Sequence, residues 1–314
     1  MLYDYFIVDA VNFAYRTFNM NSQEQPEVVG KKSIYKNYAC NFINALEDLK
    51  KKYLHSEGKV FILFDNYFSR VDLQTTFNFA DRKRLDESYK ASRKKENKQF
   101  YNTLNFLRYY YLVGPKNTFT ARLDNLEADD LVKPTIDAFI DLDKRTLLIT
   151  NDLDWCRYVG GNVDWLPSLK SEPEDYSVVS EKLGFKITTP NIIAYKACFG
   201  DASDNIKGLV SKKHIKDFIQ LAPIIEYPEQ LLIIARNPEF NSKYHFLKDI
   251  VNSERQYIIN VQLISSINCS IENIKNITTE GRFDETLYKS LREVIGLDSP
   301  KHTFVFGNIR RPRA

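Results

Sequence analysis

Three short apolar runs, separated by longer amphipathic segments, limit what this chain can fold into. Residues 5–8 (YFIV), 59–64 (KVFILF) and 145–150 (RTLLIT) are rich in β-branched and aromatic side chains, as is typical of strands buried on both faces. Between the first two runs, residues 34–54 carry apolar side chains at the spacing of one helical face. Strands and helices that alternate in this way predict an α/β fold whose central, mostly parallel sheet is flanked by helices.

Each of these apolar runs leads into aspartate. Asp9 follows the first run, Asp65 follows the second, and Asp152 and Asp154 follow the third. The carboxyl ends of parallel strands meet at one edge of a sheet, where open α/β sheets bind their ligands, so these side chains are expected to converge. A single aspartate after a strand is more often a helix cap or a turn residue. Three strands that end in the same way favour a shared acidic site.

The segment LEADDLV places Glu127, Asp129 and Asp130 among apolar residues. We predict the first turn of a helix here, with Asn125 as its N-cap and with a kink or local break at Pro134. The helix dipole stabilises an acid in the first turn by about 1 kcal/mol or less, which accounts for one or two exposed acids. Buried carboxylates this close to one another need a cation, because otherwise they take up protons.

A fourth acidic stretch, FGDASDNIKG, follows a helix that Thr189 and Pro190 are expected to open. All the acidic candidates are hard oxygen donors without histidine or cysteine among them, which selects Mg²⁺ or Mn²⁺ over zinc. A set this large could hold two such ions, which together stabilise the attacking and leaving oxygens of a phosphoryl displacement. The candidate metal ligands are Asp9, Asp65, Glu127, Asp129, Asp130, Asp152, Asp154, Asp201 and Asp204.

Composition is that of a folded protein with a sizeable core, since 43% of the 314 residues are hydrophobic. The four cysteines lie far apart and form no CxxC pair, so neither a zinc site nor a disulfide framework is indicated. No apolar stretch approaches the length needed to span a bilayer, and the first residues lack the zones of a signal peptide. We therefore expect a cytoplasmic protein without membrane contact, and a monomer.

Basic residues are concentrated between residues 82 and 98, although the net charge of the chain is only +3. The run RKRLDESYKASRKKENK contains eight lysines and arginines against three acidic residues. It suits either a solvated charged helix or a surface that binds phosphate, and the run alone favours neither.

The motifs VDAVNFAYR, LEADDLV, ITNDLDW and FGDASDNIKG, in this order, resemble those of the 5′-nuclease family of 5′-3′ exonucleases and flap endonucleases. The resemblance covers roughly residues 4–265, and it is greatest to the stand-alone replication nucleases of bacteriophages, including the ribonuclease H type. It implies a PIN-like nuclease core at residues 1–185 with a helical arch at about 70–108. A helical region of the helix–hairpin–helix (H3TH) type, with the C-terminal segment, would occupy residues 186–314.

The resemblance also implies roles for individual residues. One ion would be served by the acids from Asp9 to Asp130, and the other by those from Asp152 to Asp204. Lys90 and Arg93 match the Tyr-Lys-x-x-Arg signature of the family and would stabilise charge on the scissile phosphate, with Asp152 also catalytic. The residues implied in DNA binding are Arg16, Arg70, Arg82, Lys83, Arg84, Tyr89, Lys94, Lys95, Lys212 and Lys213.

The hairpin between residues 206 and 219 departs from the family pattern, because it keeps Gly208 but lacks the further glycines. In the family, backbone groups of this hairpin hold duplex phosphates, often with a bound K⁺. A K⁺ site therefore stays an open expectation here, and Lys212 and Lys213 could replace backbone recognition by side-chain charge.

The expected function is that of a Mg²⁺-dependent, structure-specific 5′-nuclease with a two-metal mechanism. Its substrates would be DNA with 5′ flaps or RNA-primed duplex in phage replication, with a single-strand-binding protein or a clamp as possible partners. Two alternatives stay open. A PIN-type ribonuclease would lack both the basic arch and the region of Asp201 and Asp204. In a non-catalytic branched-DNA-binding protein, so many carboxylates would only weaken the binding of phosphates.

Overall fold

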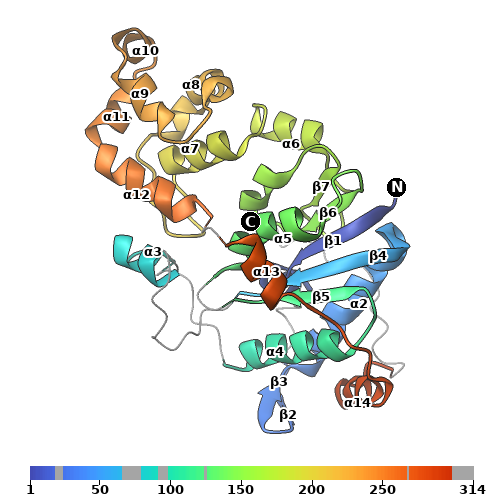
Figure 1. The fold of residues 1–314 in the computed structure, drawn as a ribbon. Coiled ribbons are helices and arrows are strands. Elements are labelled where there is room, and N and C mark those ends of the chain that lie inside the picture. Colours follow the sequence, from blue (N-terminus) through green and yellow to red (C-terminus); the bar gives the residue numbers. More distant parts are fainter. Residues whose placement is uncertain (18–23, 66–78, 91–97, 124–125, 267–268, 299–314) are drawn as a thin grey trace, which may run out of the picture.

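The computed structural model describes residues 1–17, 24–65, 79–90, 98–123, 126–266 and 269–298 (Figure 1). Within these residues, a six-stranded sheet of order β7-β6-β1-β4-β5-β8 forms the centre of the molecule. All its neighbouring strands pair in parallel except β8, which joins the edge strand β5 in antiparallel. The strands are β1 (Tyr3–Asp9), β4 (Leu54–Leu63), β5 (Thr118–Ala121), β6 (Thr146–Ile149), β7 (Val163–Leu166) and β8 (Thr279–Glu280). The predicted α/β fold with a mostly parallel sheet is confirmed.

Both faces of the sheet are covered, which explains why its strands are apolar throughout. In β1, Phe6 and Val8 pack with the helix α2 on one face, whereas Ile7 packs with the helix α5 on the other. The helices that flank this part of the sheet are α1 (Ala10–Thr17), α2 (Lys36–Tyr53), α4 (Lys98–Val113) and α5 (Ala128–Phe139). The short helix α3 (Phe79–Leu85) and the hairpin of β2 (Glu27–Val29) and β3 (Lys32–Ile34) complete the first part of the chain.

A group of short helices stands beyond the sheet, drawn in yellow to orange in Figure 1. It comprises α6 (Tyr176–Leu183), α7 (Thr189–Phe199), η2 (Lys212–His214), α8 (Ile215–Leu221), η3 (Ala222–Ile224), α9 (Gln230–Arg236), α10 (Pro238–Lys243), α11 (Leu247–Asn252) and α12 (Glu254–Ile264). Helix α7 begins with Thr189 and Pro190, as the sequence predicts, and Thr188, directly before them, is its N-cap. The chain then passes through a loop into η2 and α8, and α12 packs along α7 as it returns to the sheet.

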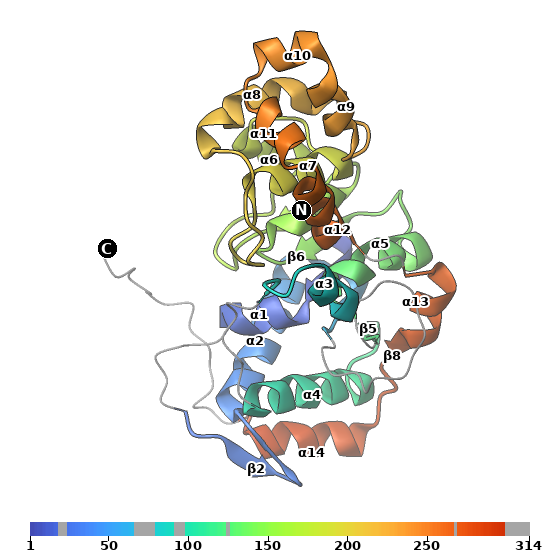
Figure 2. The same cartoon turned by 90° about the vertical axis from the view of Figure 1, so that its left-hand side faces the viewer.

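The last described residues pack against the central sheet and its helices. Helix α13 (Ile271–Ile277) contacts α5, β8 pairs with β5, and α14 (Glu285–Ile295) packs on α4 and α2 (Figure 2). The proposed division at residues 185 and 186 stays a prediction, but this C-terminal part lies with the core and not with the helical region. Among the described residues, none of the helices has the length and apolar character that crossing a bilayer requires.

Candidate active site

The order in which the chain adds strands to the sheet reverses at β1, because β4 and β5 lie on one side of this strand and β6 and β7 lie on the other. Such a switch point opens a crevice at the carboxyl ends of the strands. Asp9, the last residue of β1, is 6% exposed and accepts hydrogen bonds from the backbone N–H of Asn12 (3.0 Å) and from Thr150 Oγ1 (3.1 Å). Asp65 follows β4 and accepts from the N–H of Ala128 at 2.6 Å. These contacts tie the end of β1 to the end of β6, and the segment after β4 to the start of α5.

Helix α5 begins at the same edge, with Glu127 as its N-cap. The predicted N-cap, Asn125, lies outside the described residues, and the prediction is wrong because Glu127 caps the helix. Asp130 completes a capping box, because its carboxylate accepts from the backbone N–H of Glu127 at 3.1 Å. The helix runs through the buried Pro134 to Phe139 without a local break, whereas a kink at Pro134 stays a prediction. A proline in this position removes one hydrogen bond, and packing of the apolar face retains the helix.

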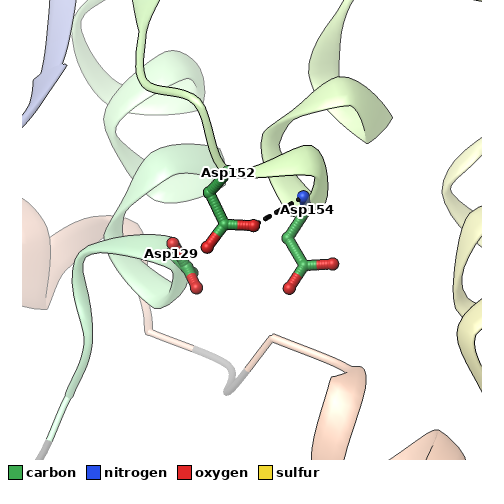
Figure 3. A group of neighbouring side chains, drawn as sticks. All are labelled: Asp129, Asp152 and Asp154. Atoms are coloured by element: carbon green, nitrogen blue, oxygen red, sulfur yellow. Dashed lines mark hydrogen bonds between the residues drawn. The ribbon is translucent and has the colours of Figure 1, made fainter. Parts of the chain in front are cut away.

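Two groups of three carboxylates share Asp154. One oxygen of each of Asp129, Asp152 and Asp154 lies within 4.8 Å of the others, and the same is true of Asp154, Asp201 and Asp204. Figure 3 shows the first group, with Asp129 on α5 facing Asp152 and Asp154. Asp152 caps the short helix η1 (Leu153–Tyr158) and accepts from the N–H of Asp154 at 2.9 Å. The expected assignment placed Asp129 with a different ion from Asp152, whereas the structure brings these two side chains together.

A close backbone contact holds the loop that carries Asp201 and Asp204. Gly200 has a φ of +80°, and a Cβ atom on it would lie 2.4 Å from the backbone nitrogen of Gly208. Asp201 and Ile206 exchange two backbone hydrogen bonds of 2.9 and 2.8 Å across the same loop. The loop therefore turns its two aspartates back toward Asp154.

Lys196 is a member of the site that our sequence reasoning missed. It is 6% exposed, and its Nζ forms ion pairs with Asp154 and, at 2.7 Å, with Asp201. Burial acts to lower the pKa of Lys196, but the surrounding aspartates raise it, so the side chain is charged. Burial acts to raise the pKa of Asp201, yet Lys196 and Ser203 hold that pKa down at about 2. A lone lysine within the apolar helix sequence TPNIIAYKACF was the available signal for this buried partner.

The negative charge of Asp9, Asp129 and Asp152 is not neutralised in this way, because burial and neighbouring aspartates raise the pKa of each. Burial, together with repulsion from Asp65 and Asp152, raises the pKa of Asp9 to about 7. Burial and the charge of Asp154 raise the pKa of Asp152 to about 6. The pKa of Asp129 is also raised well above its usual value, first by burial and then by Asp152 and Asp154. A crowded set of oxygen donors with excess negative charge fits a divalent cation such as Mg²⁺ or Mn²⁺.

These pKa values predict how the stability of the metal-free protein depends on pH. In the unfolded chain an aspartate ionises near pH 4, whereas folded Asp9 and Asp152 keep their protons up to about pH 7 and 6. Their stabilising contribution is therefore fully present below about pH 4 and is lost as the pH rises through about 6 to 7. The melting temperature in EDTA is expected to fall over this range, and saturating Mg²⁺ should remove most of the fall. A melting temperature that rises with pH in EDTA would contradict this account.

Lys90 reaches the acidic site from the predicted arch. Its side chain is 6% exposed, and its Nζ forms an ion pair with Glu127 and lies 3.5 Å from Asp204 Oδ2. Its backbone N–H also donates to the carbonyl of Asp204 at 2.8 Å. The residue adopts a φ of +55°, which is unusual for a side chain other than glycine. Lys90 therefore lies beside the acidic site with two carboxylate partners, and its catalytic role stays a prediction.

The other predicted DNA-binding residues are placed in different ways. Arg82 and Tyr89 are buried, at 3% and 2% exposure, and both donate hydrogen bonds to Glu127. In this structure both side chains are bound by carboxylates inside the protein. The basic character of their segment predicted a DNA-binding surface and gave no sign of this internal pairing. Arg16 is half-buried. The residues that are exposed are Lys83, Arg84, Lys212 and Lys213. The residues that lie outside the described part of the chain are Arg70, Arg93, Lys94 and Lys95.

The structure resembles solved nucleases of bacteriophage T5. The T5 D15 protein co-crystallised with metal ions has a TM-score of 0.63 and 19% identity, over 93% of this chain and 97% of that chain. T5 5′-exonuclease with divalent zinc ions has a TM-score of 0.62 and 20% identity, over 92% and 97%. The T5 D15 flap endonuclease in a pseudo-enzyme-product complex with DNA and metal ions has a TM-score of 0.59 and 21% identity, over 93% and 97%. At these identities the likeness establishes a common fold.

The sequence itself carries the family assignment. No curated protein matches the chain by sequence. Residues 4–184, more than half of the chain, match the family described as 5′-3′ exonuclease, N-terminal resolvase-like domain. The matched segment contains the strands β1, β4 and β6 and the carboxylates from Asp9 to Asp154. The fold, the acidic edge of the sheet and this match agree, and the chain belongs to the 5′-3′ exonuclease family of nucleases.

Proposed function

We propose that this protein is a structure-specific 5′-nuclease that requires Mg²⁺ or Mn²⁺ and cleaves phosphodiesters near a junction of single-stranded and duplex DNA. The observation that carries the proposal is the position of Asp154, which belongs to both groups of three carboxylates at the switch point of the sheet. Two oxygen-lined positions that share a ligand suit a pair of ions better than a single one. The T5 D15 flap endonuclease, which resembles this chain in fold, forms its complex with DNA and metal ions, and this supports the same function.

The residues of the site divide into ligands and supporting groups. Asp129, Asp152 and Asp154 would hold one cation, and Asp154 with Asp201 and Asp204 would hold the other. When bound, the two cations would supply charge stabilisation to the attacking and leaving oxygens of an in-line displacement. Trp155 fixes Asp129, because its Nε1 donates to Asp129 Oδ1 at 2.5 Å.

Lys90 provides positive charge beside the same carboxylates. Its Nζ lies between Glu127 and Asp204, so a phosphate that enters the site could exchange with one of these partners. A cation at this point would favour the charge that develops on the scissile phosphate over the charge of the ground state. We therefore keep the catalytic role for Lys90, and for Arg93 by its place in the same signature.

Two exposed basic groups would bind the substrate on either side of the acidic site. Lys83 and Arg84 lie on α3 at the base of the proposed arch and would hold single-stranded DNA. Lys212 and Lys213 lie in η2, at the turn between α7 and α8, and would contact duplex phosphates. A substrate with both strand types would engage both groups, which suits the removal of flaps and RNA primers during phage replication.

Cleavage of a 5′-labelled duplex with a single-stranded 5′ flap tests the proposal. With Mg²⁺ we expect cutting at or near the junction, and none in EDTA, because the cations supply the charge stabilisation. A matched RNA-primed duplex reports whether primers are also removed, and a ladder of short products would indicate exonuclease action. If neither substrate is cut in Mg²⁺ or Mn²⁺ while both bind, the non-catalytic DNA-binding alternative is correct.

A further inference from the structure

Arg82 lies at the meeting point of three parts of the chain. It belongs to α3, and its guanidinium donates to Glu127 Oε2 at 2.6 Å and to Asp130 Oδ1 at 3.0 Å, both at the start of α5. The Nη2 atom that donates to Asp130 also donates to the backbone carbonyl of Ser265 at 2.7 Å, directly after the end of α12. One buried side chain therefore joins the base of the arch, the acidic site and the end of the helical region.

The end of α12 is held by a second buried arginine. Arg157, in η1, is 7% exposed and donates to the carbonyl of Ile264 at 3.2 Å. The last carbonyls of a helix lack intrahelical partners and carry partial negative charge, so two guanidinium groups satisfy them and complement the helix dipole. The end of α12 is thus fixed to the same elements that carry Glu127 and Asp154.

The body of α12 reaches the loop that carries the last two aspartates. The side-chain amide of Asn260, which is fully buried, donates to the carbonyls of Ala197 and Lys207, each at 3.0 Å. These carbonyls lie on either side of the loop with Asp201 and Asp204. A continuous set of hydrogen bonds therefore runs from this loop through α12 to Arg82 and on to Glu127.

We propose that Arg82 is a positioning residue for cleavage, which couples the base of the arch and the helical region to the acidic site. The role rests on the proposed nuclease function. Arg82 holds Glu127 in place, and Glu127 in turn holds Tyr89 and Lys90. Because Arg82 also binds Ser265, the two regions that would contact DNA keep one arrangement relative to the carboxylates. Lysine cannot replace it, since an ammonium lacks the planar fork that serves three acceptors at once.

Hydrogen exchange in EDTA, without DNA, tests the coupling directly. In Arg82→Lys we expect the backbone amides of both α3 and α12 to exchange at least about tenfold faster than in the wild type, while β1 and β4 are unchanged. Arg84→Lys makes the same chemical change on an exposed side chain of the same helix and is the matched control. Faster exchange in α3 alone would overturn the proposal, because a purely local contact would have that effect.

Cleavage of the flap substrate gives the second readout. Arg82→Lys is expected to lower kcat by about tenfold or more and to leave KM within about twofold, since it changes the placement of the carboxylates and removes none of the exposed basic residues that would contact phosphate. A folded Arg82→Lys protein with wild-type kcat would overturn the role. If this variant does not fold, Asp130→Asn keeps the shape of the partner and should raise exchange in the same two helices. Because exchange is measured without metal, a wild-type protein that fails to cut would count against the proposed function alone.

Discussion

Asp154→Asn is expected to lower the rate of flap cleavage by about a thousandfold or more, with DNA binding retained. Asp154 contributes an oxygen to both groups of carboxylates, so its loss weakens both candidate cation positions at once. Binding of DNA in EDTA should be unchanged or tighter, because a carboxylate repels phosphate. The measurements are single-turnover cleavage at saturating Mg²⁺ and DNA affinity in EDTA.

The control for this variant makes the same change on an exposed acid. Asp137→Asn, on α5, replaces an aspartate that pairs with Lys133 at the surface. It should cleave at the wild-type rate, since exposed ion pairs contribute little. If Asp154→Asn cleaved within about threefold of Asp137→Asn, the acidic groups would have a purely structural role and the assignment of the site would be wrong.

Lys90→Ala is expected to lower kcat by about a hundredfold and to change DNA affinity by only a few fold. The substitution removes the cation between Glu127 and Asp204, so it removes a charge that acts on the reacting phosphate. It also leaves the buried Glu127 with one partner fewer, so the melting temperature in EDTA should fall. Stopped-flow cleavage and fluorescence anisotropy with a labelled flap separate the two effects.

The matched control removes an exposed lysine from α5, the helix whose first turn carries Asp129 and Asp130. Lys133→Ala leaves the site untouched, because Lys133 pairs with Asp137 on the surface of α5. We expect wild-type kcat and wild-type affinity for this variant. If Lys90→Ala weakened affinity and kcat to the same degree, Lys90 would be a binding residue and its catalytic role would have to be abandoned.

The sheet and the acidic edge could be predicted because both depend on local sequence. A buried parallel strand needs a short run of apolar, β-branched side chains, and residues 59–64 and 145–150 satisfy this without reference to the rest of the chain. Asp9, at the end of β1, follows from the same pattern because it comes directly after such a run. The family motifs then connected these segments with Asp201 and Asp204.

The partners of the buried charges could not be predicted, because they come from distant parts of the chain. Arg82 stands in a basic run that suits a DNA-binding surface, yet Glu127, 45 residues further on, takes up its charge inside the protein. The pairing of Lys196 with Asp154 has the same origin. The edge strand β8 is only two residues long, and its sequence carries no strand signal strong enough to find it. Such features depend on tertiary packing.

The antiparallel strand β8 has a consequence for how this nuclease is made in the cell. Thr279 and Glu280 cover the edge of β5, where Phe119 and Thr120 would otherwise offer unpaired backbone groups. A ribosome that adds about 5–20 residues per second needs roughly 8–30 s to pass from Ala121, the end of β5, to Glu280, so this edge lacks its partner strand for that time. During that interval the nascent chain can pair with other strands and aggregate. The segment that carries β8 therefore covers the edge of β5 late in synthesis, and the sheet is complete only after residue 280 has been added.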